Sequence, residues 1–358
     1  MKIIFIEEID FMKQLMKKET MGGIETNTRD VITELKKKGH EVYVNSDIPN
    51  GGRPDVVASS TYGPYVQYKL YSLKEKYKCA CVQHAHTTAE DLQGNFLPNI
   101  DLFNKTLIPM YIRKLYSYSH IIITPTEYSA HCLKNSGINK IIRVISNGVK
   151  LEKFKPAHGV NHKSRFRDYL LDKYKIDPAI PIIVNCGYTW KRKGLGTFLK
   201  VAQDLPQYAF VWVGPIVENE YTKLAQKIPN VTFAGFYDDI RDVYYGGDIF
   251  FFPSLVENQG IPLIEAAVCG IPIVTRDILP FAWLTNEIHC YKGKNATDFI
   301  EIIPEMLNLG TKKQQMIENA KRLAIDLHDF NKIGARIEEI YYQAEIVRKI
   351  YQNKYGIL

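Results

Sequence analysis

The chain has 358 residues, a length that is large for a single hydrophobic core and suits two domains of ordinary size. Apolar residues make up 46% and charged residues 24%, a composition that excludes an intrinsically disordered protein. No apolar run approaches the roughly 18 residues that a membrane-spanning helix needs, so no such helix is expected. The opening apolar run, Lys2–Ile6, is too short for a signal peptide and predicts a first strand.

The charge of the chain is uneven. Residues 1–155 hold 22 lysines and arginines against 16 aspartates and glutamates, whereas the remaining residues hold 24 against 23. A basic amino-terminal half suggests an anionic partner such as a lipid surface. A lysine-rich face that contacts only solvent explains the same numbers.

Six cysteines are scattered along the chain, and Cys79 and Cys81 lie two residues apart in a predicted strand. Residues at this spacing share one face of a strand, which favours core packing over metal binding. We therefore expect a reducing, cytoplasmic protein without a disulfide framework.

Strand and helix patterns alternate in the first half, as parallel sheets covered by helices require. After the first strand, Gly22 and Gly23 open a segment with helically spaced apolar residues that ends at Gly39. A glycine pair is also common in plain turns, so by itself it is weak evidence for a ligand site. Further strands are expected at residues 40–45, 56–58, 79–83, 121–124 and 141–146.

Two segments combine apolar or aromatic residues with basic ones. Residues 8–21 interleave phenylalanine, methionine and leucine with lysine, and residues 102–118 interleave phenylalanine and tyrosine with lysine and arginine. Each segment could form an interfacial helix that contacts a lipid surface or an acceptor, or could pack against the core. Nucleic acid is a less favoured partner, because neither segment belongs to a known nucleic-acid module.

A turn at residues 146–149 and a charged connection through about residue 178 separate the two halves. We place one domain at 1–155 and another at 156–335. Two similar α/β halves predict two Rossmann-like, doubly wound parallel-sheet domains, with ligands at the carboxyl ends of the strands in a cleft between them. Strands are expected at residues 180–186, 208–213, 231–234, 249–252 and 271–275, and a long helix from 332 to about 354.

The most informative stretch runs from residue 249 to residue 275. It predicts a buried strand, a loop, a helix that starts at Gly260-Ile261-Pro262 and a second buried strand. Unpaired N–H groups at a helix start attract anions, and glycine permits the close approach of a phosphate. Glu257 and Glu265 flank this position and can accept hydrogen bonds from hydroxyl groups. The combination fits a nucleotide sugar, although an ordinary helix start with a nearby acid needs no ligand.

This stretch resembles the donor-binding motif of glycosyltransferase family 4, which consists of retaining enzymes with the GT-B fold. The motif has two glutamates separated by seven residues, here Glu257 and Glu265, around an inner Gly-x-Pro, here Gly260 and Pro262. In the family the first glutamate contacts the transferred sugar, which makes Glu257 a catalytic candidate, and the second holds the ribose hydroxyls. Backbone amides at the glycine bind the diphosphate.

The resemblance also implies that residues 336–358 form a helix that crosses back onto the amino-terminal domain. The donor-binding candidates are Gly22, Gly23, Gly187, Arg192, Phe236, Asn258, Gln259, Gly260, Ile261 and Glu265.

Residues 187–194 leave a strand and enter a helix with three consecutive basic side chains. Basic groups at such a position can neutralise a leaving diphosphate. Lys193 matches the family lysine that contacts the phosphates and is a catalytic candidate, but Tyr188 stands where the family usually has arginine. This departure leaves Arg192 or Lys191 to supply the charge; an exposed basic turn without a ligand is the plain alternative.

A histidine pair follows the strand predicted at 79–83. His86 resembles the family histidine beside the donor sugar and is a catalytic candidate, while one member of the pair with His84 could be purely structural. No third or fourth ligand follows at a zinc-like spacing, so we expect no metal. Glu90 and Asp91 are candidates for orienting the acceptor hydroxyl, or else solvated loop acids.

The resemblance implies transfer with retention of the anomeric configuration of the sugar. The diphosphate would leave with its charge stabilised by Lys193 and the amides near Gly260. The acceptor hydroxyl would attack from the same face and pass its proton to a phosphate oxygen. This route requires no enzyme nucleophile, and the sequence offers no convincing one. The family also implies that neither a cofactor nor a catalytic metal is needed.

The loop at residues 86–94, Tyr188 and residues 276–278 look similar to family members that glycosylate diacylglycerol or its monoglycosyl form. The expected donor is UDP-glucose or UDP-galactose, and the expected acceptor is a membrane glycolipid or diacylglycerol at the inner face of the membrane. A polysaccharide precursor is the rival acceptor, and a nucleotide-sugar-binding protein without activity is a further alternative. A Rossmann-type oxidoreductase is disfavoured, because the full Gly-x-Gly-x-x-Gly fingerprint is missing after the first strand.

Overall fold

The computed structural model describes residues 1–8, 23–61, 63–93 and 106–355. Gly22, nearly all of the segment at 8–21 and residues 102–105 of the second aromatic segment lie outside the described residues. The chain forms two compact units: unit 1 comprises Met1–Asn147 and Phe330–Leu358, and unit 2 comprises Gly148–Asp329. The domain boundaries expected from the sequence, after residues 155 and 335, lie a few residues later.

Unit 1 is built on a parallel sheet that has six strands among the described residues. Their order is β2-β1-β3-β4-β5-β6, so the order of winding reverses between β1 and β3. The central strands are runs of β-branched and small apolar residues buried on both faces, as expected of a sheet covered by helices. The strands are β1 Lys2–Ile6, β2 Glu41–Val44, β3 Val56–Ser59, β4 Ala80–His84, β5 Ile121–Thr124 and β6 Ile141–Val144.

Alternation along the strands divides the core of unit 1 between the two faces of its sheet. Ile3 and Phe5 of β1 pack with α2 and α14, whereas Ile4 and Ile6 pack with α3 on the other face. The helices are α2 Gly23–Lys37, α3 Pro64–Tyr77, α4 Ala89–Gln93, α5 Ile108–Leu115, α6 Glu127–Asn135 and α14 Phe330–Tyr355, with a short 3-10 turn η1 Pro49–Gly51.

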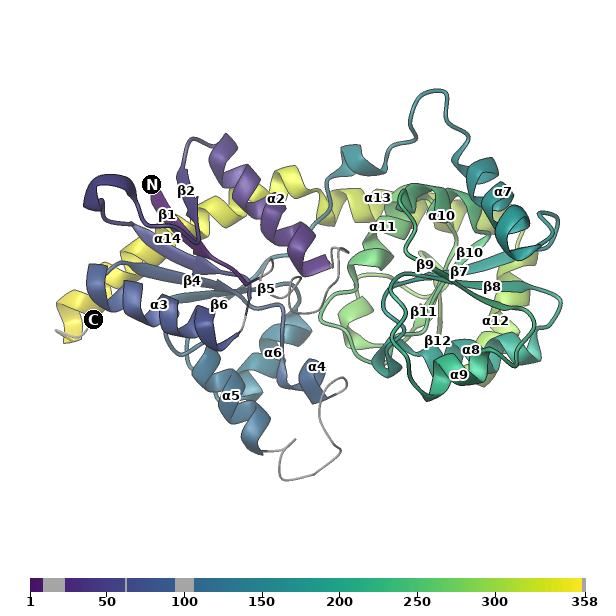
Figure 1. The fold of residues 1–358 in the computed structure, drawn as a ribbon, viewed down its shortest axis with the longest axis horizontal. Helices are drawn as coiled ribbons and strands as arrows, with labels where there is room; N and C mark the ends of the chain where they lie inside the picture. The colour runs from purple at the N-terminus through teal and green to yellow at the C-terminus, as the bar shows by residue number, and fades with distance from the viewer. Residues whose placement is uncertain (9–22, 62, 94–105, 356–358) are drawn as a thin grey trace. The chain divides into compact units, whose positions relative to one another are not determined.

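The last helix, α14, belongs to unit 1 although it follows unit 2 in the sequence (Figure 1). Apolar residues at three- or four-residue spacing give it a continuous buried stripe, which packs over β3, β4 and α2. The end of the chain therefore supports the first sheet. The stripe consists of Phe330, Ile333, Ile337, Ile340, Tyr341 and Ala344.

Unit 2, all of whose residues are described, contains a second parallel sheet of six strands in the order β12-β11-β10-β7-β8-β9. The order reverses between the neighbouring strands β7 and β10, and open α/β sheets bind ligands at the carboxyl ends of the strands at such a switch point. The strands are β7 Ile182–Cys186, β8 Ala209–Val213, β9 Val231–Gly235, β10 Ile249–Phe252, β11 Ile273–Arg276 and β12 Tyr291–Gly293.

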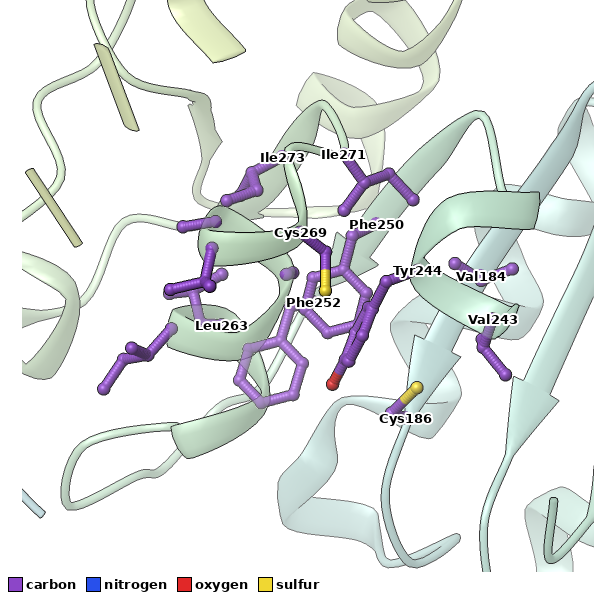
Figure 2. Packing of buried hydrophobic residues seen from close by; sticks show 14 of the residues in the cluster. Val184, Cys186, Val243, Tyr244, Phe250, Phe252, Leu263, Cys269, Ile271 and Ile273 are labelled. Carbon is purple, nitrogen blue, oxygen red and sulfur yellow. The ribbon is translucent and has the colours of Figure 1, made fainter. Parts of the chain in front are cut away.

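Three consecutive phenylalanines in β10 fill both cores of unit 2. Phe250 and Phe252 point to one face, where Figure 2 shows them with Tyr244 and Leu263, and Phe251 points to the other. The helices are α7 His162–Tyr174, α8 Leu195–Asp204, α9 Glu220–Ala225, α10 Ile240–Gly246, α11 Ile261–Cys269, α12 Ala296–Asn308 and α13 Thr311–His328, with 3-10 turns η3 Leu151–Phe154, η4 Lys191–Lys193 and η5 Leu279–Phe281.

The predicted α/β class with parallel sheets is confirmed, and every predicted strand overlaps an observed one. The strand predicted from residue 271 begins at Ile273, because Pro272 cannot donate a ladder hydrogen bond. The strand β12 was not predicted, since its three residues include a lysine and a glycine. All six cysteines are unbridged and buried, and Cys79 and Cys81 share one core cluster as expected. No helix in the described ranges is long and apolar enough to span a bilayer.

Candidate functional site

Two loops leave adjacent strands at the switch point of unit 2. Residues 187–194 follow β7 and residues 253–260 follow β10, and the two strands are hydrogen-bonded neighbours. The backbone N–H of Leu255 donates to the carbonyl of Arg192 at 2.7 Å. A Cβ on Gly194 would lie 2.1 Å from the carbonyl oxygen of Pro253, so only glycine allows the loops to approach this closely. The sheet order and this glycine together hold the two loops in contact.

Glu257 is the centre of a charged cluster formed by these loops. Lys193 Nζ lies 2.5 Å from Glu257 Oε1, and Arg192 Nη1 lies 3.7 Å from Glu257 Oε2. The Ser254 hydroxyl donates to the same carboxylate at 3.0 Å. Burial alone would raise the pKa of Glu257, but the charges of Lys193 and Arg192 outweigh it and hold the pKa below the ordinary value. The carboxylate is therefore ionised, and two cations face one anion.

The helix α11 begins at Ile261, as predicted, directly after this loop. Gly260 has φ +78°, and a Cβ there would come within 2.8 Å of the Phe281 ring. Glycine thus sets the turn into the helix and lets the Phe281 ring pack against the backbone just before Pro262. The first turn of a helix has N–H groups without intrahelical partners, which favours a negatively charged ligand.

Glu265 lies about one turn into α11 and is half-buried. Its Oε2 accepts a hydrogen bond from the hydroxyl of Tyr244 at 2.7 Å. Burial raises the pKa of Glu265, and the Tyr244 hydrogen bond opposes that rise. Figure 2 shows the Tyr244 side chain beside Phe250, where packing fixes its ring. The Tyr244 hydrogen bond therefore fixes the Glu265 carboxylate, which can still accept hydrogen bonds from ligand hydroxyl groups.

The other donor-binding candidates of unit 2 lie at the same edge of its sheet. Gly187 directly follows β7, and its N–H donates to the carbonyl of Val213 at 2.8 Å. Gln259 is buried, Asn258 is half-buried, and both belong to the β10 loop. Phe236 follows β9 and is 58% exposed, so its ring is accessible to a ligand.

The histidine pair lies in unit 1, at the carboxyl end of β4. His84 and His86 are both buried, and their rings stack with centroids 6.4 Å apart. Nε2 of His84 is 3.0 Å from the hydroxyl of Tyr341 on α14. Burial lowers the pKa of His86 to about 4, and burial together with the neighbouring His86 lowers that of His84 to about 3. Both rings are therefore neutral at neutral pH.

The remaining candidates of unit 1 are Gly23, Glu90 and Asp91. Gly23 is the first residue of α2 and is exposed. Glu90 and Asp91 stand in the first turn of α4; Oε2 of Glu90 is buried with no hydrogen bond assigned to it among the described residues, and the Cys132 thiol lies beside the same carboxylate. A buried carboxylate oxygen normally has a donor, so this atom is suited to a ligand hydroxyl.

One group of described residues has ligand atoms close enough to hold a metal ion, and it was not among the sequence candidates. It consists of His162, Asp239 and Asp242, with ligand atoms within 4.8 Å of one another. Nδ1 of His162 lies 2.5 Å from Asp242 Oδ1, and its Nε2 accepts from the N–H of Ala157. Tyr237 donates to the other oxygen of Asp242. Hydrogen bonds therefore account for both ring nitrogens and for the buried carboxylate.

Sequence reasoning missed three side chains that hold the candidates in place. Ser254 lies three residues before Glu257, a spacing at which a hydroxyl commonly reaches a neighbouring group, so this contact was within reach of local reasoning. Tyr244 and Tyr341 are 21 and 257 residues from the groups that they contact. No local pattern signals such contacts.

Two family models match the chain. The model described as Glycosyltransferase Family 4 matches residues 47–153, and the one described as Glycosyl transferases group 1 matches residues 180–308. The second match contains the charged cluster, α11 and Glu265. The first contains the histidine pair.

Curated relatives include enzymes that are named for lipid acceptors. The chain is 26% identical over 293 residues to the processive diacylglycerol alpha-glucosyltransferase of Acholeplasma laidlawii, covering 78% of this chain and 83% of that protein. It is 26% identical over 222 residues to the alpha-galactosylglucosyldiacylglycerol synthase of Streptococcus pneumoniae, covering 59% of this chain and 58% of that protein.

Among solved structures, Anabaena HepE in complex with UDP and glucose is similar to this chain with a TM-score of 0.74 and 18% sequence identity. The match covers 96% of this chain and 100% of that chain. The likeness is one of fold.

Proposed function

Because the chain belongs to glycosyltransferase family 4 and has the GT-B fold, we propose that it moves a hexose from a nucleotide sugar to a lipid hydroxyl. The proposal takes the donor to be UDP-glucose or UDP-galactose and the acceptor to be diacylglycerol or a membrane glycolipid. The observation that carries it is the pairing of Lys193 and Arg192 with one carboxylate, Glu257, at the switch point of unit 2. Lysine and arginine side chains form strong charge-assisted hydrogen bonds to phosphate oxygens, so both cations suit a diphosphate at this position.

The donor would bind along the carboxyl edge of the second sheet. The diphosphate would lie against Lys193, Arg192 and the first-turn amides after Gly260. Glu265 would accept hydrogen bonds from the ribose hydroxyls, and the exposed ring of Phe236 would stack on the base. Anabaena HepE, a protein of the same fold, was solved in complex with UDP and glucose, which supports a UDP-sugar as the donor.

The transfer would proceed with retention of the anomeric configuration. The bond between the anomeric carbon and the leaving oxygen of the diphosphate breaks while Lys193 and the amides near Gly260 stabilise the charge on that oxygen. The acceptor oxygen forms its bond to the same face of the sugar, and its proton passes to the departing phosphate. Glu257, with its pKa held low, stays ionised as a hydrogen-bond acceptor for the sugar hydroxyls.

We propose that the reaction needs neither a cofactor nor a metal ion. The lysine and the arginine of the charged cluster would carry out the charge neutralisation that a divalent cation performs in other transferases. His86 remains the catalytic candidate of unit 1, and its low pKa makes it a neutral hydrogen-bonding group.

A lipid acceptor is supported by the names of the two curated relatives and by two features of unit 1. The first feature is Glu90, whose buried Oε2 would accept a hydrogen bond from the acceptor hydroxyl. The second is a set of exposed aromatic and apolar side chains on α3 and α5, which the half-buried Tyr118 links to α3 through its contact with Tyr71. We call this group the tyrosine patch; it comprises Tyr65, Tyr68 and Tyr71 of α3, Met110 and Tyr111 of α5, and Tyr118.

The tyrosine patch joins α3 to the segment in which sequence reasoning left two interpretations open. Tyr71 contacts Tyr118 with ring centroids 5.0 Å apart, and Lys114 Nζ lies 5.0 Å from the Tyr118 ring. In α5, Ile112 packs into the core, which is one of the two interpretations, while Tyr111 is exposed and would contact a lipid surface under the proposed function. Aromatic rings with basic neighbours suit the interface of an anionic bilayer, so the patch supports a peripheral position at the inner face of the membrane.

A direct transfer assay tests the proposal. The protein is incubated with UDP-glucose or UDP-galactose and with vesicles of diacylglycerol in phosphatidylglycerol, and lipid products are identified by mass spectrometry. A hexosyl-diacylglycerol is expected, and the proton coupling at its anomeric carbon should show the α configuration. Lys193→Gln should lose most of the turnover, while Lys191→Gln, which removes a charge from the same turn outside the cluster, should keep it.

Two outcomes would contradict the proposal in different ways. Transfer to a water-soluble glycan or an isoprenoid-linked precursor, with none to diacylglycerol, would favour the polysaccharide alternative. If the protein binds the donor but shows neither transfer to any acceptor tested nor slow hydrolysis of the donor, a nucleotide-sugar-binding protein without activity would be favoured.

A further inference from the structure

Arg276, the last residue of β11, is a buried cation that contacts three neighbouring segments at the carboxyl edge of the second sheet. Its Nε donates to the carbonyl of Pro253 at 3.0 Å, and its Nη2 donates to the hydroxyl of Thr197 at 2.8 Å. Its Nη1 donates to the carbonyl of Lys294, in the turn before α12. The guanidinium carbon lies 5.6 Å from the centroid of the Phe299 ring. One side chain, only 7% exposed, therefore joins the β10 loop, α8 and the turn before α12.

Two of these acceptors belong to the segments that carry the charged cluster. Pro253 is the first residue of the β10 loop, directly before Ser254, whose hydroxyl donates to Glu257. Thr197 lies in the first turn of α8, the helix that follows Lys193. The guanidinium of Arg276 thus connects the start of the loop that carries Glu257 to the helix behind Lys193.

The carbonyl of Pro253 is also the point at which the two loops touch. Its oxygen is the atom that a Cβ on Gly194 would approach to 2.1 Å. The preceding carbonyl, of Phe252, accepts a hydrogen bond from the hydroxyl of Thr275 at 2.9 Å. Consecutive side chains at the end of β11 therefore fix consecutive carbonyls at the end of β10, at the place where the β7 loop packs against it.

Fold stability alone does not account for a guanidinium at this position. Burial lowers the pKa of Arg276, and the charge of Asp298 opposes that shift. The side chain nevertheless stays protonated, because arginine keeps its proton in proteins. A buried charge costs free energy that hydrogen bonds must offset, and apolar side chains commonly replace buried charges without loss of stability. What an apolar side chain could not supply here is the set of three directed hydrogen bonds.

We propose that Arg276 is a positioning residue for the transfer step, which acts through Pro253 and Thr197 to hold Lys193 in place against the Glu257 loop. This inference rests on the proposed function. A guanidinium is a rigid fork of five N–H donors that can bond to separate acceptors at once, whereas the single ammonium of a lysine cannot reach three segments. A displacement of about 1 Å at a catalytic group can lower a rate by about 100-fold.

A second buried arginine, at the other edge of the same sheet, provides a matched control. Arg167 of α7 donates to the carbonyls of Gly246 and Pro178 and to the carboxylate of Asp248. Gly246 and Asp248 precede β10, and Pro178 precedes β7, so these contacts lie at the amino ends of the two strands. Loss of Arg167 removes buried hydrogen bonds from the same unit without touching either loop of the cluster.

The test compares turnover, donor affinity and stability in the same variants. Transfer to diacylglycerol vesicles is measured with UDP-glucose or UDP-galactose, whichever the wild type uses, UDP affinity by calorimetry and stability by thermal unfolding. Arg276→Lys should lower the turnover number by about 10- to 100-fold and leave the UDP affinity nearly unchanged. Thr197→Val should give part of that loss, and Thr197→Ser, which keeps the hydroxyl, should restore it. Arg167→Lys should lower the melting temperature and keep the turnover number.

A double-mutant cycle with Lys193→Gln separates positioning from a general loss of structure. In that background, measured at higher enzyme concentration, Arg276→Lys should lower the remaining turnover by less than about threefold, because the group that it positions is already gone. If Arg276→Lys fails to fold, the cycle is made with Thr197→Val, which removes only one hydroxyl.

Three results would overturn the inference. The first is a wild-type turnover number in both Arg276→Lys and Thr197→Val. The second is an equal loss of turnover in Thr197→Val and Thr197→Ser. The third is the same factor of loss with and without Lys193, which would assign Arg276 to the fold alone. In each case transfer by the wild type would leave the proposed function intact. A wild-type protein that transfers no sugar would overturn both.

Discussion

The hydroxyl of Tyr341 lies 3.0 Å from Nε2 of His84, and both side chains are buried. The contact joins α14 to the end of β4 across 257 residues of sequence. Because His84 stacks against His86, the last helix of the chain helps to fix the loop that carries the catalytic candidate of unit 1.

Tyr341→Phe should destabilise the protein. The substitution keeps the buried ring but leaves a buried nitrogen of His84 without its partner, which costs about 1–3 kcal/mol. Urea denaturation followed by circular dichroism measures the change in the free energy of unfolding. Tyr342→Phe is the matched control, since Tyr342 is 48% exposed and should change stability by less than about 0.5 kcal/mol. A loss in Tyr341→Phe no greater than that of the control would show that the contact contributes nothing.

The stability of the protein should fall on mild acidification. Burial lowers the folded-state pKa of His84 to about 3 and that of His86 to about 4, whereas an unfolded histidine has a pKa of about 6.5. Between pH 6.5 and 4 the unfolded chain therefore binds protons that the folded chain does not. Each such proton lowers the free energy of unfolding by about 1.4 kcal/mol per pH unit.

Urea denaturation at pH 7, 6 and 5 measures this dependence, and His84→Gln should make it shallower. The matched control is His131→Gln, which replaces an exposed histidine of the same unit. Equal slopes for the wild type and His84→Gln would mean that His84 titrates normally in the folded state.

Glu265 and Lys193 should have separable effects on donor use. Glu265→Gln should weaken the binding of uridine and the binding of UDP by similar factors of roughly ten, because both ligands contain the ribose. Lys193→Gln should mainly lower the turnover number, since its charge acts most strongly on the leaving diphosphate. Calorimetry and steady-state kinetics on both variants distinguish these effects. Unchanged binding in the first variant together with unchanged turnover in the second would remove both residues from the site.

The tyrosine patch should contribute to binding of anionic vesicles. The double variant Tyr68→Ser and Tyr71→Ser should sediment less with phosphatidylglycerol vesicles than the wild type, and the binding of both should fall as salt rises. Tyr342→Ser, an exposed tyrosine of unit 1 outside the patch, is the control. Equal sedimentation of the patch variant and the control would show that another surface binds the lipid.

The sequence was most informative where local patterns decide the structure. The run Ile249–Phe252, the helix start at Ile261 and the strand at Ile121–Thr124 were all predicted to the residue or nearly so. Buried parallel strands and a glycine-proline helix start leave strong local signals. The family resemblance implied that Lys193 and the amides near Gly260 act on one diphosphate, but the sequence itself did not predict the contact between the β7 and β10 loops.

Contacts between distant parts of the chain could not be predicted in the same way. The pairing of Arg192 with Trp190 needs the rotamers of both side chains, and the partners Tyr244 and Tyr341 come from other helices. The strand β12 is too short for periodicity to show. These features depend on tertiary packing, which overrides local preference.

The central claim is that the loops after β7 and β10 bind the nucleoside diphosphate of the donor. Hydrogen–deuterium exchange with and without saturating UDP tests it most directly, because backbone amides of both loops are monitored at once. The account predicts that UDP slows exchange in peptides covering residues 187–194 and 257–265, with no comparable change at His162 to Tyr174 of α7. Saturating binding of UDP with protection confined to other segments would contradict it.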